Sequence, residues 1–135
     1  MTSRRPLVFR VQCPNTGLGP YNGPEWEDKW AMSTSHCDSA HQPPQRDPDL
    51  YAVASHEKCG CVNPASLLAW FDGWWHKLAA AGFVVTIVRP VDVRVGANGQ
   101  AVFDSTDVEE RDVLDIETFL GLFAELPETC ATVFS

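Results

Sequence analysis

The chain has 135 residues, of which 44% are hydrophobic and 21% charged, and its formal net charge is −8. This length and composition are typical of one globular domain, over residues 1–135, that buries a core without disulfides. Its ten lysines and arginines are scattered, which argues against binding to the nucleic-acid backbone. The acidic charge fits either a small-molecule site or contact with a basic partner protein.

The amino-terminal residues have a weak likeness to an export signal. Arg4 and Arg5 precede the apolar residues 7–9, but Arg10 ends this apolar run after three residues. The other apolar runs are too short to cross a bilayer. We therefore expect a cytoplasmic protein that makes no membrane contact.

Residues 7–12 predict the first strand, in which alternate apolar residues point to one face and Arg10 points to the other. A guanidinium on an inward face requires an anionic partner, because an unpaired buried charge is costly. That partner is either a protein carboxylate, such as Asp104, or a phosphate-bearing ligand. The glycine-rich residues 16–23 follow, and they form either a loop whose amides approach a ligand or a simple chain reversal.

A long polar stretch then runs from residue 13 to residue 50. Within it, residues 25–32 predict one or two helical turns that place Trp26 and Trp30 on one face. Because these two tryptophans lie outside any core pattern, they are candidates for contact with a ligand or partner. Residues 51–55 predict a short strand.

A core helix is predicted over about residues 64–81. Asn63 suits the N-cap, Pro64 suits the first helical position, and apolar side chains recur at helical spacing until Gly82 ends the helix. Residues 83–88 are apolar on both faces, as in a strand that is covered on both sides.

The last third of the chain predicts a hairpin and a second helix. Residues 91–95 and 100–104 read as two strands joined by a turn. Thr106 and Glu109 have the spacing of a capping box, so a C-terminal helix is expected over about residues 107–126. The whole pattern predicts a single α+β domain with small mixed or antiparallel sheets.

The cysteines and histidines suggest a second kind of site. Five cysteines in a chain without a secretion signal argue against a disulfide framework, which leaves free thiols, a Cys/His nucleophile or a zinc site. The alternative is that the cysteines are small buried hydrophobes and the histidines are solvated. The zinc ligands would come from His36, Cys37, His41, His56, Cys59 and Cys61.

Six short motifs carry a resemblance to known proteins. They lie at residues 9–12 (FRVQ), 16–23 (TGLGPYNG), 41–43 (HQP), 67–71 (LLAWF), 81–85 (AGFVV) and 100–104 (QAVFD). Their order over about residues 7–104 resembles a family of small phage- and prophage-encoded proteins of uncertain function. This resemblance implies a protein of the host cytoplasm.

The same order of elements resembles, more remotely, the ADP-ribosyltransferase fold, which holds NAD in a cleft between two small sheets. The resemblance implies that Arg10 grips the pyrophosphate or ribose side of NAD. A hydroxyl would orient the nicotinamide ribose, and Gln100 would bond the 2′-OH as charge builds at the anomeric carbon. The implied cofactor-binding residues are Arg10, Gly19, Tyr21 and Tyr51, and the implied catalytic residues are Gln100 and Ser55.

Gln100 departs from the glutamate that transferases acting on proteins place on this strand. An amide cannot serve as a general base, so the transfer would go to a nucleotide or nucleic acid, or the fold would bind NAD-like ligands without turnover. A third alternative is that the resemblance is only architectural and implies neither activity nor ligand. Two alternative functions are a non-enzymatic acidic phage protein that binds and inhibits a host or defence protein, and a small zinc-binding domain.

Overall fold

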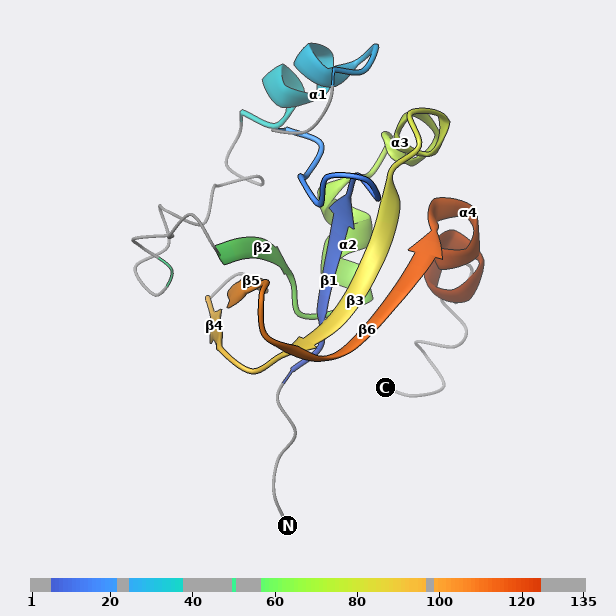
Figure 1. The fold of residues 1–135 in the computed structure, drawn as a ribbon. Helices are drawn as coiled ribbons and strands as arrows, with labels where there is room; N and C mark the ends of the chain where they lie inside the picture. The colour runs from blue at the N-terminus through green and yellow to red at the C-terminus, as the bar shows by residue number, and fades with distance from the viewer. Residues whose placement is uncertain (1–5, 22–24, 38–49, 51–56, 97–98, 125–135) are drawn as a thin grey trace, which may run out of the picture.

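A computed structural model of the chain describes residues 6–21, 25–37, 50, 57–96 and 99–124. Six strands in these ranges form one antiparallel sheet in the order β4-β5-β2-β1-β3-β6 (Figure 1). The strands are β1 (Val8–Gln12), β2 (Glu57–Cys61), β3 (Val84–Pro90), β4 (Val93–Val95), β5 (Gln100–Asp104) and β6 (Val108–Asp115). The helices are α1 (Lys29–Ser35), α2 (Pro64–Trp70), α3 (Trp75–Ala80), α4 (Ile116–Phe119) and the π-helical turn η3 (Leu120–Ala124).

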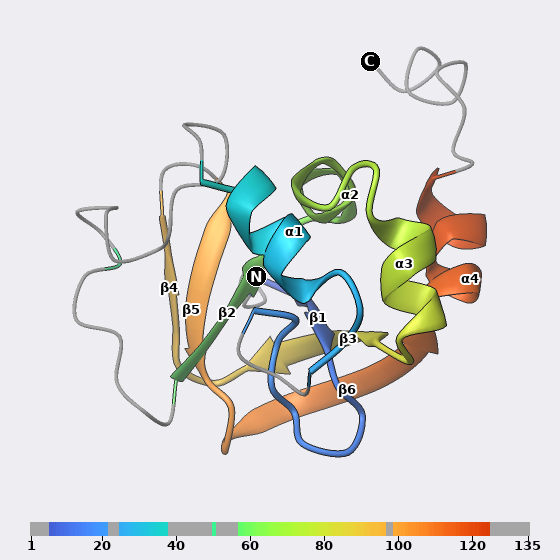
Figure 2. The same ribbon diagram turned by 90° about the horizontal axis from the view of Figure 1, so that it is seen from above.

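The sheet bends sharply where β2 meets β1. Figure 2 shows β4, β5 and β2 running across the direction of β3 and β6. Only Phe9 and Cys61 are in register between β1 and β2. Gly60 permits this close crossing, because a Cβ at that position would lie 2.6 Å from Cγ1 of Val8 and 2.7 Å from the carbonyl oxygen of Phe9.

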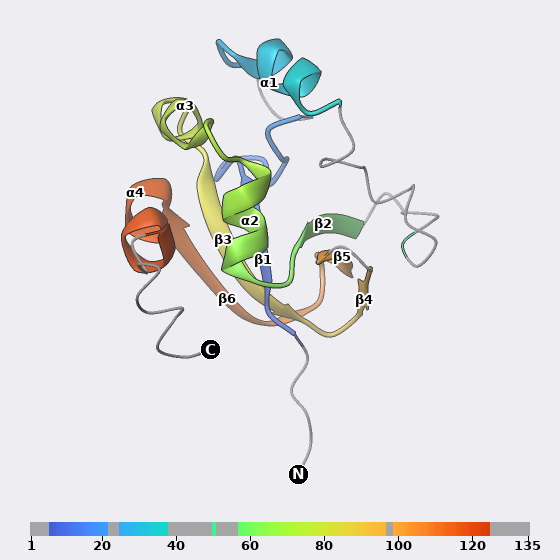
Figure 3. The ribbon, with the colours of Figure 1, turned by 180° about the vertical axis from the view of Figure 1, so that it is seen from behind.

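The bend creates two apolar clusters on opposite faces of the sheet. Alternation along β1 sends Phe9 and Val11 to one cluster and Val8 to the other, as the sequence predicts. Strand β3 likewise contributes Val85 to the first cluster and Val88 to the second, so the prediction that it is covered on both faces is confirmed. Helices α2, α3 and α4 lie together on one face (Figure 3). Their contributions to the first cluster include Leu67, Phe71, Trp75, Leu78, Ile116 and Phe119.

The predicted helix over residues 64–81 is interrupted. Its start is confirmed, since Oδ1 of Asn63 accepts a hydrogen bond from the next turn and Pro64 occupies the first position. Helix α2 then ends at Trp70, and α3 begins at Trp75. Between them Gly73 has φ +85°, a left-handed conformation that stops helical hydrogen bonding.

The predicted C-terminal helix is wrong over residues 107–115, because Val108–Asp115 form β6. Thr106 does not cap a helix: its amide and hydroxyl both donate to Oδ1 of Asp104, in the turn between β5 and β6. The outer edge of β3 pairs with β6 over seven register positions, and this pairing overrides the local helical pattern. Helical structure begins after Asp115, whose carboxylate accepts from the amide of Thr118 at 2.7 Å.

The predicted hairpin of β4 and β5 is confirmed, and so is the α+β class. Helix α1 begins later than the predicted turns over residues 25–32. Strand β2 was not predicted, because its sequence has no β-branched or aromatic residue to indicate a strand. The predicted strand over residues 51–55 lies outside the described residues. None of the helices that the structure describes has both the length and the apolar composition of a membrane span.

Candidate functional site

Arg10 lies near the centre of the sheet, on β1, with 8% of its surface exposed. Its Nε donates to Oε1 of Gln12 at 3.2 Å. Nη1 donates to the carbonyl of Cys59 at 2.9 Å, and Nη2 donates to the carbonyl of Gly17 at 3.0 Å. All three acceptors are neutral oxygens. Of the two kinds of partner that the sequence left open, a carboxylate such as Asp104 does not bond to Arg10 in the described part of the chain.

Burial of the Arg10 guanidinium disfavours its charged form. Burial lowers the pKa of the Arg10 guanidinium, and a charge interaction and a hydrogen bond with the Cys59 side chain only partly offset this effect. A guanidinium has five N–H groups, of which the three hydrogen bonds above use three. A nearly buried cation whose partners are neutral is short of negative charge, and it is therefore a good receptor for an anion.

Lys58 brings a second cation to the same place. Its Nζ lies 3.8 Å from the point where a Cβ on Gly17 would stand. Partial burial and the charge of Arg10 both lower the pKa of Lys58, while Cys59 raises it. In the described part of the chain Lys58 has no ion pair. We refer to Arg10, Lys58 and the backbone of residues 17–19 as the cationic cluster.

The loop of the cationic cluster is ordered by its own hydrogen bonds. The amide of Cys13 donates to the carbonyl of Leu18, and the amide of Gly17 donates to the carbonyl of Cys13, both at 2.8 Å. Gly17 has φ +74°, so this turn requires a glycine. Gly19 lies against Arg10, since a Cβ there would stand 3.5 Å from Nη2. The sequence prediction placed Arg10 and Gly19 at one site, and the structure brings them together.

Tyr21 belongs to a different cluster. Its hydroxyl accepts from Nε1 of Trp70 at 2.8 Å and shares a short hydrogen bond with Nδ1 of His36. Its ring stacks on Phe71. The hydrogen bonds of Arg10 end on other residues, so none of them reaches Tyr21. The tyrosine connects the loop to α1 and α2.

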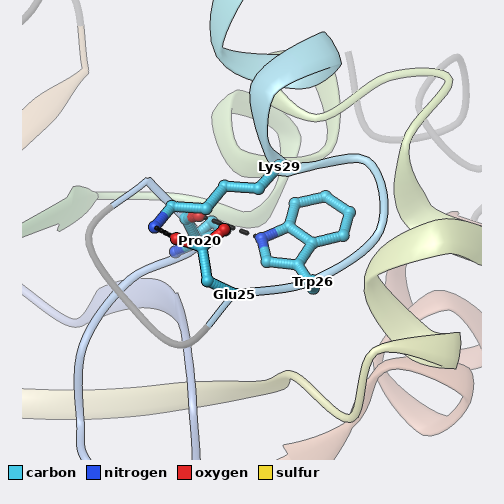
Figure 4. Close-up of polar contacts among 4 residues, drawn as sticks. All are labelled: Pro20, Glu25, Trp26 and Lys29. Carbon is cyan, nitrogen blue, oxygen red and sulfur yellow. Dashed lines mark hydrogen bonds and ion pairs between the residues drawn. The ribbon is translucent and has the colours of Figure 1, made fainter.

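The segment before α1 holds Trp26 in place (Figure 4). Nε1 of Trp26 donates to the carbonyl of Pro20 at 3.1 Å, and its ring packs edge-on against Phe83. Nearby, Nζ of Lys29 pairs with a carboxylate oxygen of Glu25 at 3.1 Å. Trp26 is thus an anchor of the loop. Trp30 is 69% exposed and remains a candidate for contact with a partner.

The remaining residues implied by the NAD resemblance are Gln100, Tyr51 and Ser55. Gln100 is buried at the start of β5, in register with Cys61. Tyr51 and Ser55 lie outside the described residues. The sequence prediction gave Cys59 only as a zinc ligand and did not include Lys58. Both residues lie on β2, so a sequence pattern that indicated this strand would have placed them next to Arg10.

The structure describes four of the six candidate zinc ligands, so it does not test the zinc hypothesis. His36 contacts Tyr21, and the thiol of Cys37 donates to the carbonyl of Ser33. Burial raises the pKa of the Cys61 thiol to about 12. Among the described residues no group of three or more His, Cys, Asp or Glu could hold a metal ion. His41 and His56 lie outside these residues, so a zinc site stays a prediction.

Comparison with known proteins identifies a family for this chain. Residues 1–117 match the family model described as Bacteriophage T4 Y00F protein. No curated protein and no solved structure gives a significant match to the chain.

Proposed function

The chain belongs to the bacteriophage T4 Y00F protein family, and we propose that this phage protein binds a small phosphate-bearing ligand at its cationic cluster. The resemblance to phage-encoded proteins is confirmed by this membership. The proposal keeps the ligand class expected from the sequence, with NAD and ADP-ribose as the first nucleotides to test. Transfer of ADP-ribose would be an activity additional to this binding.

The observation that carries the proposal is the pairing of Arg10. A buried charge is stable when it faces an opposite charge, yet the three hydrogen bonds from Arg10 to oxygen all end on neutral acceptors, and the Cys59 side chain offsets only part of the effect of burial. A phosphate would supply the missing charge, and its oxygens match the planar fork of a guanidinium. A nearby carboxylate would already have lowered the demand for such a ligand.

Lys58 and the loop support the same ligand. The amine of Lys58 and the guanidinium of Arg10 both lie next to Gly17, so one phosphate group at this loop could contact both cations. Gly17 and Gly19 present backbone rather than side chains there, which lets a ligand approach closely. On a chain of net charge −8, this arrangement concentrates positive charge locally.

The test is thermal denaturation with inorganic phosphate, pyrophosphate, ADP, ADP-ribose and NAD, each against a chloride control of equal ionic strength. A ligand at a hundred times its Kd stabilises the folded state by about 2.7 kcal/mol. For a domain of this size each kcal/mol raises Tm by roughly 4 °C. Adenosine and nicotinamide, which lack phosphate, should leave Tm unchanged.

Matched lysine variants locate the site. Lys58→Gln removes one cation of the cluster, while Lys77→Gln removes one from α3, where the amine lies 3.8 Å from Asp28 and is half exposed. Lys58→Gln should weaken binding about tenfold, the effect of losing one charge-assisted contact. Lys77→Gln should bind as the wild type does. Equal affinity of the two variants, or no response to any phosphate compound, would refute the proposal.

Turnover is measured separately from binding. After incubation with NAD, chromatography detects nicotinamide if the glycosidic bond is cleaved. Release that falls in Gln100→Ala and Ser55→Ala would support the catalytic roles implied for these residues. Binding without release would identify a ligand-binding protein.

A further inference from the structure

We propose a second binding surface, the outer edge of β6, which would accept an extended lysine- and arginine-rich segment of a partner protein as an additional strand. This surface is independent of the cationic cluster. Its occupant is inferred from the backbone of the edge and from the charge placed along it.

Strand β6 has one partner in the described part of the sheet. It pairs with β3 along one side and ends the strand order on the other. Figure 1 shows β6 on the rim of the sheet along its full length. Because backbone groups alternate in direction along a strand, half of those in β6 point away from β3. An extended segment of another chain could bond to them.

The acidic residues along this edge indicate that the partner segment is basic. Residues 107–117 carry six acidic side chains and one arginine, a formal charge of −5. Arg89 of β3 pairs with one of these acids, Glu110, at 3.0 Å, so the segment stays acidic after this ion pair is counted. Five consecutive residues of β6, from Glu109 to Val113, are exposed. The acidic residues are Asp107, Glu109, Glu110, Asp112, Asp115 and Glu117.

The same acidic residues determine which strands can pair with the open edge of β6. Edge strands commonly carry charges that prevent pairing with further copies of the same chain. Two copies of this edge would repel each other, whereas a basic segment would be attracted and oriented. Val113 is 55% exposed and Leu122 on η3 is 55% exposed, so apolar residues of the partner also have contacts to make.

Fluorescence anisotropy with a labelled peptide of alternating lysine and valine tests the proposal. The control peptide has the same sequence with alternate backbone nitrogens methylated, which keeps the charge but prevents strand pairing. The unmodified peptide should bind at least tenfold more tightly. Equal binding of the two peptides would show charge attraction without strand addition and would overturn the proposal.

Charge-reversal variants locate the binding. Glu109→Lys combined with Asp112→Lys changes the edge, while Glu27→Lys combined with Asp72→Lys changes net charge equally at exposed positions in turns outside β6. Circular dichroism confirms that both variants are folded. The edge variant should lose tenfold or more in affinity, and the control should lose much less. Equal losses would mean that the peptide senses total charge, which would also overturn the proposal.

Discussion

Replacing Gly60 with alanine should destabilise the crossing of β2 and β1. The added Cβ would stand 2.6 Å from Cγ1 of Val8 and 2.7 Å from the carbonyl oxygen of Phe9. Carbon atoms in contact prefer a separation of about 3.5 Å or more. The valine can adjust its rotamer, but the carbonyl is backbone, so β2 itself must move.

The expected cost follows from two opposing terms. Overpacking of this kind costs about 1–3 kcal/mol. Alanine in a strand is otherwise favoured over glycine by roughly 0.5–1 kcal/mol, because glycine loses more backbone entropy on folding. Because the contacts of 2.6 and 2.7 Å are severe, the upper half of the overpacking range applies, and the net loss in free energy of unfolding is about 1–2.5 kcal/mol. This loss corresponds to roughly 4–10 °C in Tm for a domain of this size.

Thermal and urea denaturation followed by circular dichroism measure this loss. The matched control is Gly121→Ala on η3, where an added Cβ meets no atom within 4 Å. Its Tm should be unchanged or slightly higher, because alanine favours helical structure. If Gly60→Ala unfolds at the same temperature as Gly121→Ala, the close crossing of β2 and β1 is not what this glycine provides.

Three further predictions concern single contacts. Asn63→Ala should cost about 1 kcal/mol in urea denaturation because it removes the N-cap of α2, and Asn63→Asp should restore most of the loss. Tyr21→Phe should cost about 1–3 kcal/mol, since it removes the hydroxyl bonded to buried His36. Hydrogen bonds from the first turn of α4 lower the pKa of Asp115 in the folded state. The contribution of Asp115 to the free energy of unfolding is therefore complete above the ordinary aspartate pKa. It is lost as the pH falls through the lowered pKa of the folded state. The difference in stability between wild type and Asp115→Ala should shrink toward acidic pH; a constant difference would contradict this reasoning.

Elements with strong local signals were predicted well. The alternation around Arg10 located β1, and Asn63 with Pro64 located the start of α2. The turn ending at Gly99 located the hairpin. In each case the physical cause lies within a few residues: side-chain alternation, a cap or a left-handed turn.

The candidate site could be predicted only in part. Arg10 and Gly19 are close in sequence, so the strand and the loop after it already imply that they meet. Cys59 meets Arg10 across 49 positions of the chain, and Lys58 is carried with it. That contact depends on β2, whose sequence has too little apolar alternation to be recognised as a strand.

Residues 107–115 show where local sequence stops being sufficient. Their spacing of acidic and apolar side chains suits a helix, yet Val108–Asp115 form β6. The outer edge of β3 supplies backbone partners for this segment, and an open edge is a property of the folded sheet that no local pattern contains. Caps, turns and alternation are short-range, so the chain alone specifies them. Strand pairing and the partners of Arg10 are long-range, and only the folded sheet decides them.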